Sequence, residues 1–374
     1  MSGRERKGSD VLVVGGGAIG LACARALARG GRSVTVLDQG RPGAEATRAA
    51  GGMLSPLAEA EGPGPFLDLG LASLDLWPTF AAALRAETGV DVDLRADGKL
   101  LLALDEAAAD RLRRRRAWTA RAGFRTEWLE GEALRAREPN AARTATAGLH
   151  VERDGQVDNR LLGDALARAA DAAGCRVRGE TRVTELLTVG SRVRGVRTDD
   201  RFEHAADLVV IAAGAWTGTL GLPRPLPVRP IKGQMIALAA GSASPVTLLE
   251  TDACYLIPRR SGSVWVGATS EDVGFSRGTD PAARSALRRA AEAAVPALGR
   301  AAETEAWDGF RPGTPDGLPV IGADPEIAGL VYATGHYRNG ILLTPITAEL
   351  VVACVDGPAS SRLHPYRADR FADR

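Results

Sequence analysis

Three glycines near the start of the chain have the spacing of a loop that binds a diphosphate. They are Gly15, Gly17 and Gly20, and they lie between the apolar run 11–14 and a segment, 18–30, with apolar residues at helical spacing. In such a strand–loop–helix the first glycine allows a tight turn, the second lets the backbone approach a pyrophosphate, and the third lets the helix pack closely on the sheet. The helix N-terminus adds a partial positive charge that faces the phosphates. The pattern predicts a dinucleotide site.

An acidic residue stands at the position where a dinucleotide site needs one. Asp38 follows the apolar run 34–37 and lies 18 residues beyond Gly20, close to the usual interval of about 20 residues. Its carboxylate can accept hydrogen bonds from both ribose hydroxyls and would repel a 2′-phosphate, which disfavours NADP. The alternative is a glycine-rich turn that holds no ligand, and the strand, the helix and the acid together argue against it.

A loop of small residues favours FAD over NAD. An NAD dehydrogenase would continue with further strand–helix units, whereas this chain enters a stretch rich in Gly, Pro and Ala at 41–65. The segment 49–53, AAGGM, has side chains small enough for the backbone to approach a flat, bulky group such as an isoalloxazine. Tight packing of a plain loop explains the same residues, and the sequence leaves both explanations open.

The elements that must position these residues are of two kinds. Strand–helix units occur early, in the middle and at the end of the chain, and strand-rich insertions separate them. We therefore expect an α/β fold, with a Rossmann-like FAD-binding domain and an interleaved α+β substrate domain built on a mostly antiparallel sheet. The expected FAD-binding domain is discontinuous and comprises residues 1–88, 145–222 and 305–374. The expected substrate-binding domain comprises residues 89–144 and 223–304.

Three longer segments carry a family pattern. They are 11–53, with EATRAAGGM at its end, GFRPGTPDG at 309–317 and ATGHYRNGILL at 333–343, and CYLIPR at 254–259 is a weaker fourth. Over nearly its whole length the chain resembles the D-amino-acid oxidase superfamily of FAD enzymes and, within it, the glycine oxidases of the thiamine pathway. The resemblance implies a D-amino-acid oxidase-like fold and suggests a homotetramer.

The resemblance also implies an activity, that of an FAD-dependent amino-acid oxidase. Its substrates would be glycine and other small amines, such as sarcosine and small D-amino acids. A hydride passes from the amine to flavin N5, and the products are an imine, then glyoxylate and ammonia, with oxygen reduced to hydrogen peroxide. The flavin carries the chemistry, so no catalytic side chain is needed if the amine binds in its neutral form. In the thiamine pathway the imine supplies thiazole synthesis.

The cofactor contacts follow from the same resemblance. Together with the glycine loop they are Gly15, Gly17, Ala18, Ile19, Gly20, Asp38, Gln39, Ala46, Thr47, Gly51, Gly52, Met53, Val183, His336, Tyr337, Arg338, Asn339, Gly340, Ile341 and Leu342. Val183 would meet the adenine end through its backbone. The last helix, expected over 341–356, would direct its N-terminus toward flavin O2. Sarcosine oxidases attach FAD to a cysteine shortly before a Thr-Pro-Asp sequence. Residues 307–313, ahead of Thr-Pro-Asp at 314–316, contain no cysteine, so we expect non-covalent FAD.

Three residues are candidates for substrate binding. Arg311 and Arg338 match the substrate-contacting arginines of the family, and Tyr255 matches a substrate-facing tyrosine. An arginine binds a carboxylate through a planar fork of N–H donors, and a tyrosine hydroxyl adds one hydrogen bond. Because the chain has many arginines, an ordinary surface charge is the alternative for each. His336 is a candidate general base, but we prefer to interpret it as a structural loop residue that contacts the flavin.

Composition bears on partners and location. With 47 basic and 46 acidic residues, the net charge of +1 gives no reason to expect nucleic acid or a membrane as a partner. The arginine-rich stretch 111–116 is typical of a solvated helix face, and a polyanion site is the alternative. Four scattered cysteines show no metal or disulfide spacing and suit the cytoplasm. The charged stretch 4–7 is followed by a glycine-rich run that is not typical of a signal peptide. We expect a small amino acid and oxygen as partners, and no metal.

Two other functions remain open. The same scaffold could act as a dehydrogenase of D-amino acids or N-methyl amino acids that passes electrons to a quinone or another acceptor. It could also be an FAD-holding subunit without its own substrate site, although Arg311 argues against this interpretation.

Overall fold

A parallel sheet carries the glycine loop. The computed structural model describes residues 9–357 and 361–372, so the charged stretch 4–7 lies outside the described residues. Within these ranges the sheet has six strands in the order β18-β19-β12-β1-β2-β8. They are β1 (Val11–Val14), β2 (Val34–Leu37), β8 (Arg176–Arg178), β12 (Leu208–Ile211), β18 (Val320–Ala323) and β19 (Leu330–Thr334). Neighbours pair in parallel except β18 with β19, which confirms the predicted Rossmann-like core.

Strand β1 shows why both faces of this sheet are covered. Val11 and Val13 pack into the core shared with the helices, whereas Leu12 and Val14 pack on the other face, against a small antiparallel ribbon. A strand that is apolar at every position needs apolar partners on both faces. The covering helices are α1 (Ala18–Arg29), α4 (Pro65–Thr88), α7 (Asn159–Ala172) and α9 (Thr344–Asp356), and the ribbon consists of β9 (Val183–Val189), β10 (Arg192–Thr198) and β11 (Glu203–Ala205).

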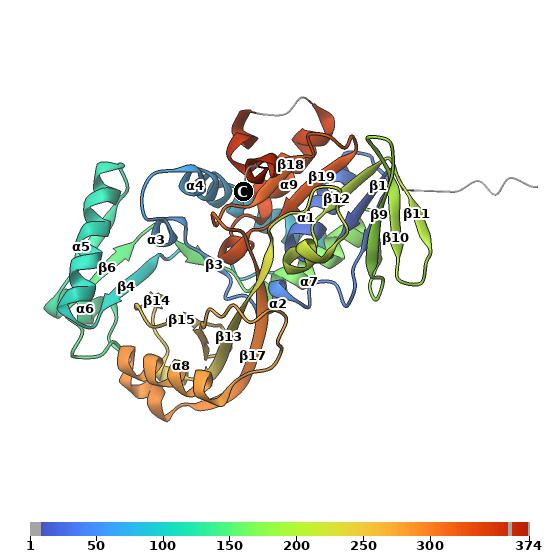
Figure 1. Ribbon diagram of the computed structural model, residues 1–374. Coiled ribbons are helices and arrows are strands. Elements are labelled where there is room, and N and C mark those ends of the chain that lie inside the picture. The colour runs from blue at the N-terminus through green and yellow to red at the C-terminus, as the bar shows by residue number, and fades with distance from the viewer. Residues whose placement is uncertain (1–8, 358–360, 373–374) are drawn as a thin grey trace, which may run out of the picture.

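A second sheet forms the other half of the molecule (Figure 1). In the part of the chain that the structure describes it has eight strands, in the order β17-β13-β16-β15-β14-β4-β6-β5. They are β4 (Lys99–Ala103), β5 (Thr126–Leu129), β6 (Ala147–Val151), β13 (Arg229–Ala239), β14 (Leu248–Glu250), β15 (Tyr255–Pro258), β16 (Ser263–Gly267) and β17 (Ala302–Gly313). Every pair is antiparallel except β4 with β14, so the predicted mostly antiparallel sheet is confirmed.

Helices α5 (Glu106–Arg121), α6 (Gly131–Arg137) and α8 (Pro281–Ala294) pack on this second sheet. The arginine-rich stretch lies on α5. Arg111 there pairs with Asp252, and Arg113 pairs with two acids of its own helix. All these side chains are largely exposed, so acidic neighbours on the surface balance part of the positive charge of the stretch.

Two of the expected domain boundaries fall at strands of the second sheet. The boundary at 145 precedes β6, which pairs with β4 and β5, and the boundary at 305 lies inside β17. Figure 1 shows β17 running from the second sheet toward the first. The division into two discontinuous domains stays a prediction.

Short elements join the two halves. They are α2 (Ala46–Ala49), β3 (Met53–Leu54), α3 (Pro56–Glu59) and β7 (Gly155–Gln156), with the 3₁₀ turns η1 (Gly214–Thr219), η2 (Gly241–Ala243), η3 (Pro296–Arg300), η4 (Tyr337–Asn339), η5 (Ser361–Tyr366) and η6 (Ala368–Phe371) in the loops. The last helix begins at Thr344, three residues later than expected, because Pro345 fits only the first turn of a helix. Residues 341–343 form turns instead.

Two kinds of feature are missing from the described ranges, residues 9–357 and 361–372. No helix there combines the length and the apolar character that crossing a membrane requires. Nor do those residues gather three or more His, Cys, Asp or Glu side chains into a group that could hold a metal ion.

Candidate active site

A cavity and an adjoining groove begin at the glycine loop. The cavity encloses about 1070 Å³, part of it open to solvent, and reaches from the start of α1 to the face of the second sheet. The groove encloses about 690 Å³ and runs from the same loop past the end of β2 to the start of β9. Both are lined by Gly17, Thr47 and Gly214. Together they form one elongated site at the carboxyl ends of the parallel strands, where α/β sheets bind their ligands.

Each glycine of the loop meets a different constraint. Gly15 has φ +106°, and a Cβ there would lie 2.3 Å from the carbonyl oxygen of Ala212. A Cβ on Gly20 would lie 1.9 Å from the oxygen of Gly15, so α1 packs closely on the loop, as predicted. The nearest atom to a Cβ on Gly17 would be the Thr47 hydroxyl, at 3.4 Å. The protein therefore does not itself fill the space beside Gly17, and that space suits a bound diphosphate.

Asp38 ties the glycine loop to the end of β2. One carboxylate oxygen accepts a hydrogen bond from the N–H of Gly16 at 2.6 Å, and the other accepts one from the N–H of Gly40 at 2.8 Å. Each oxygen keeps a further lone pair, and Asp38 lines the groove together with Gln39 and Val183. The contact of Asp38 with ribose stays a prediction.

The small-residue loop lines the cavity and is also tightly packed. Gly52 has φ +76°, and a Cβ there would lie 2.1 Å from the carbonyl oxygen of Val157. A Cβ on Gly51 would lie 2.6 Å from the Ile257 side chain. The structure therefore shows the tight packing, and the same residues line the cavity, whereas the approach of the loop to an isoalloxazine stays a prediction.

Three side chains outside the sequence candidates hold this loop and the adjoining helix α2 by their carbonyl groups. Trp307 donates its ring N–H to Ala49 at 3.0 Å, Asn159 donates to Thr47 at 2.8 Å, and Arg259 donates to Gly51 at 2.7 Å. Arg259 is buried, its guanidinium lies 3.9 Å from the Trp265 ring centroid, and burial lowers its pKa to about 10. Because all three anchors lie at least 100 residues from the loop, only the weak 254–259 pattern pointed to any of them.

Arg311 and Tyr255 face the cavity from the second sheet. Arg311, on β17, donates to the carbonyl oxygens of Thr269 at 3.0 Å and Lys232 at 3.4 Å. Among the described residues it has no acidic partner. Burial raises the pKa of Tyr255, the positive charges of Arg311 and Arg338 oppose the rise, and the hydroxyl therefore stays protonated at neutral pH. An arginine without a counter-ion beside a protonated hydroxyl suits an anionic group of a ligand.

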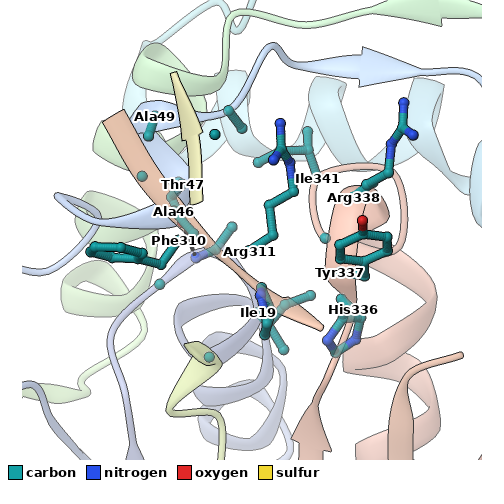
Figure 2. Close-up of a pocket in the computed structure, with 18 of the residues that line it drawn as sticks. Ile19, Ala46, Thr47, Ala49, Phe310, Arg311, His336, Tyr337, Arg338 and Ile341 are labelled. Carbon is teal, nitrogen blue, oxygen red and sulfur yellow. Dashed lines mark hydrogen bonds between the residues drawn. The ribbon is translucent and has the colours of Figure 1, made fainter. Parts of the chain in front are cut away.

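Arg338 lines the same cavity from the turn before α9, and its guanidinium lies 3.3 Å from a carboxylate oxygen of Glu59. Figure 2 shows Arg311 and Arg338 extending toward the same side of the cavity from two different elements, with His336 and Ile19 at the opposite side. The structure thus brings together the three residues predicted to bind substrate, but it gives one of the two arginines an acidic partner.

His336 lines the cavity as a neutral, buried ring. Its Nε2 lies 3.0 Å from the hydroxyl of Thr347, and burial lowers its pKa to about 3. A ring with so low a pKa is a weak base, which supports the preferred structural interpretation.

The lowered pKa of His336 predicts that the stability of the fold depends on pH. The unfolded chain binds a proton on the ring near pH 6.5, whereas the folded chain binds it only near pH 3. Acidification from pH 6.5 to 3 therefore favours unfolding, by up to about 1.4 kcal/mol per pH unit, and His336 adds no slope above pH 6.5. Chemical denaturation at several pH values measures the free energy of unfolding of the wild type and of His336→Gln. Between pH 6.5 and 3 the stability of the variant should fall less steeply, because it lacks the contribution of His336. Parallel curves would contradict the assignment.

Three of the predicted cofactor residues lie outside the lining of both spaces: Gly20, Asn339 and Leu342. Leu342 anchors its loop, since its carbonyl oxygen accepts hydrogen bonds from Ser73 at 2.6 Å and Trp77 at 2.9 Å. The backbone of Asn339 bonds to His336 and Leu343 within the same loop. For these three, as for the other predicted cofactor residues, direct contact with the cofactor stays a prediction.

Several lining residues were not predicted from the sequence. Ala212 and Gly214 follow β12, and Ala333 and Thr334 end β19, so the rule that ligands lie at the carboxyl ends of parallel strands would have found them. Gly233 and Met235 come from the second sheet, and no local signal distinguishes them, whereas Phe310 lies in the 309–317 motif beside Arg311.

Comparison with known proteins identifies the family. Residues 10–354 match the DAO family model, described as FAD dependent oxidoreductase. The chain belongs to this family. FAD is therefore its cofactor, and the open space beside Gly17, the exposed backbone of the 49–53 loop and the groove past Asp38 fit that molecule.

Two relatives and one solved structure are informative for this FAD-dependent oxidoreductase. It is 38% identical to the glycine oxidase of Geobacillus kaustophilus (strain HTA426) over 356 residues, which cover 93% of each chain. It is 38% identical to the bifunctional protein ThiO/ThiG of Synechocystis sp. over 370 residues, which cover 97% of this chain and 54% of the relative. The crystal structure of glycine oxidase from Geobacillus kaustophilus superposes with a TM-score of 0.92 at 35% identity, covering 97% of this chain and 99% of that one. The D-amino-acid oxidase-like fold is thereby confirmed.

The mode of FAD attachment stays a prediction. The described residues that line the cavity and the groove include none of the four cysteines, which agrees with non-covalent binding. Acid precipitation of the protein should release all of the flavin into the supernatant, and flavin that stays with the pellet would contradict this expectation.

Proposed function

We propose that this FAD-dependent oxidoreductase oxidises glycine and other small amines, such as sarcosine and small D-amino acids. With glycine the products are an imine, which hydrolyses to glyoxylate and ammonia, and hydrogen peroxide from oxygen. The observation that carries the proposal is the position of Arg311, a cation without an acidic partner among the described residues. It extends into a cavity that the 49–53 loop also lines. The similarity to glycine oxidases supports the same conclusion.

The residues of the chain bind and orient the substrate. The guanidinium of Arg311 pairs with the substrate carboxylate, and the hydroxyl of Tyr255 donates a hydrogen bond to it. The hydrogen bonds of Arg311 to the carbonyl oxygens of Thr269 and Lys232 fix the direction of its guanidinium before substrate binds. Bound FAD supplies the hydride acceptor for the reaction. Apolar lining residues, among them Met53 and Met235, limit the access of water to the reacting carbon.

No side-chain base is assigned. His336 stays neutral and pairs with Thr347, so the amine enters in its neutral form rather than losing a proton to the protein. The pH dependence of flavin reduction by the substrate then follows the ammonium group of the substrate rather than a residue of the chain.

The similarity to a ThiO/ThiG protein supports a place for the product imine in thiazole synthesis. We further propose that the protein is a homotetramer and that it works in the cytoplasm. Light scattering of the purified holoenzyme tests the tetramer directly. A monomer or dimer at micromolar concentration would contradict the tetramer.

Anaerobic mixing with glycine tests the proposed activity. Glycine should bleach the flavin absorbance, and readmitted oxygen should restore it with release of hydrogen peroxide. Bleaching by D-alanine or D-proline but not by glycine, with slow reoxidation by oxygen and fast reoxidation by a quinone, would contradict the proposal and favour a dehydrogenase. An FAD-holding subunit would show no bleaching with any amine.

A further inference from the structure

The two arginines of the cavity differ in charge balance. Arg311 donates to two backbone carbonyl oxygens and has no acidic partner among the described residues. Arg338 pairs with Glu59 at 3.3 Å. The cavity therefore offers a carboxylate one uncompensated cation, although it contains two guanidinium groups.

Glu59 is held in place by its own short helix. Two N–H groups of α3, from Leu57 and Ala58, donate to the buried carboxylate of Asp154 at 3.3 and 3.1 Å. The Glu59 side chain is only 14% exposed, against 45% for Arg338. Glu59 is not itself a lining residue, but its partner Arg338 is, so the ion pair places a carboxylate directly behind the cavity wall.

Other charges nearby are already paired. Lys99 is fully buried behind Met53, at 4.0 Å from its sulfur, and forms an ion pair with Glu250. Burial raises the pKa of Asp154 to about 7, so part of its population is neutral at physiological pH. Lys99 therefore supplies no second free cation to the cavity, and Asp154 adds at most a partial negative charge.

We propose that Glu59 determines substrate specificity by neutralising Arg338, so that the enzyme selects amines with one anionic group and rejects those with two. The inference rests on the proposed function and adds the charge class of its substrates. The substrate carboxylate balances Arg311. A second carboxylate finds Arg338 occupied and meets the charge of Glu59 in a partly buried site, where water screens repulsion poorly.

Ligand binding tests this without turnover. Acetate and malonate differ by one carboxylate, and the flavin absorbance of the holoenzyme reports the binding of either. In Glu59→Gln the affinity for malonate should rise about tenfold or more, because Arg338 becomes free to form a charge-assisted hydrogen bond, while the affinity for acetate should change by less than about threefold. Glu61→Gln is the matched control, since Glu61 is an exposed acid two residues away, and both affinities should stay as in the wild type.

A second variant links the gain to Arg338. In Glu59→Gln with Arg338→Gln the tighter malonate binding should disappear. The proposal would be overturned if the double variant still bound malonate more tightly than the wild type. It would also be overturned if Glu59→Gln, with normal FAD content, bound malonate no more tightly than the wild type. If Glu59 instead holds the substrate amine, Glu59→Gln would slow flavin reduction by glycine without tightening malonate, which would also overturn it.

Turnover adds an independent measurement. The ratio of flavin reduction rates for D-aspartate and D-alanine should rise about tenfold or more in Glu59→Gln, and an unchanged ratio would count against the proposal. The proposed function fails separately, if wild-type flavin is not reduced by glycine or any small amine. The acetate and malonate titrations still decide the role of Glu59 in that case.

Discussion

Replacing Arg311 by alanine is expected to lower kcat/KM for glycine by about 100-fold or more while FAD stays bound. A hydrogen bond to a charged group contributes about 1.5–3 kcal/mol, and each 1.4 kcal/mol changes the rate about tenfold. A bidentate pair with the carboxylate lies at the upper end of this range, since the site is partly buried. Arg311→Lys keeps the charge but loses the planar fork, so its kcat/KM should fall between the values of the wild type and of Arg311→Ala.

Stopped-flow reduction of the flavin under anaerobic conditions measures this effect. Arg229→Ala is a suitable control, because Arg229 lies on β13, beside β17, in an exposed ion pair with Asp272 that contributes little. The ratio of flavin to protein absorbance in each variant shows whether FAD is retained. An Arg311→Ala variant that reduces its flavin at the wild-type rate would rule out the assigned role.

Gly15→Ala is expected to abolish FAD binding and to destabilise the fold by about 3 kcal/mol or more. The added Cβ would lie 2.3 Å from the oxygen and 2.7 Å from the carbon of the Ala212 carbonyl, both rigid backbone atoms. Positive φ at an alanine costs about 1–2 kcal/mol, and overpacking adds about 1–3 kcal/mol. Because the glycine loop lies between β1 and α1, relief of the clash would move the loop that faces the cofactor.

Gly31→Ala separates the cost of a positive φ at alanine from the cost of the close contact with Ala212. Gly31 has φ +88°, but a Cβ there would meet no atom within 4 Å. This control should lose only about 1–2 kcal/mol and keep its FAD. Flavin content after gel filtration and the free energy of unfolding in denaturant are the measurements. Equal losses in the two variants would show that the close contact with Ala212 is not the cause.

The local chemistry of the dinucleotide site could be predicted from the sequence. The strand, the glycine loop, α1 and Asp38 lie within 30 residues, and their spacing alone specifies a strand–turn–helix with a phosphate-sized space. The α7 helix and its cap at Asp158 are equally local, because the carboxylate accepts hydrogen bonds from the next turn. The start of α9 was misplaced by three residues, since Pro345 outweighs the apolar pattern ahead of it.

The substrate half of the site depended on tertiary structure. Glu59 and Arg338 lie 279 residues apart, and Arg259 lies 208 residues from the Gly51 carbonyl oxygen that it binds. No periodicity or motif spacing encodes such pairs, because they arise when the second sheet folds onto the first. The family resemblance identified Arg311 and Arg338 as a pair, yet only the folded chain shows that one of them is neutralised.

The sequence by itself predicted a dinucleotide site around Gly15, Gly17, Gly20 and Asp38, because every residue needed for that inference lies within one strand–helix–strand unit. Only the tertiary structure decided how many free charges face the substrate. A carboxylate and a guanidinium influence each other over a few ångströms of space, and the distance along the chain does not determine that separation.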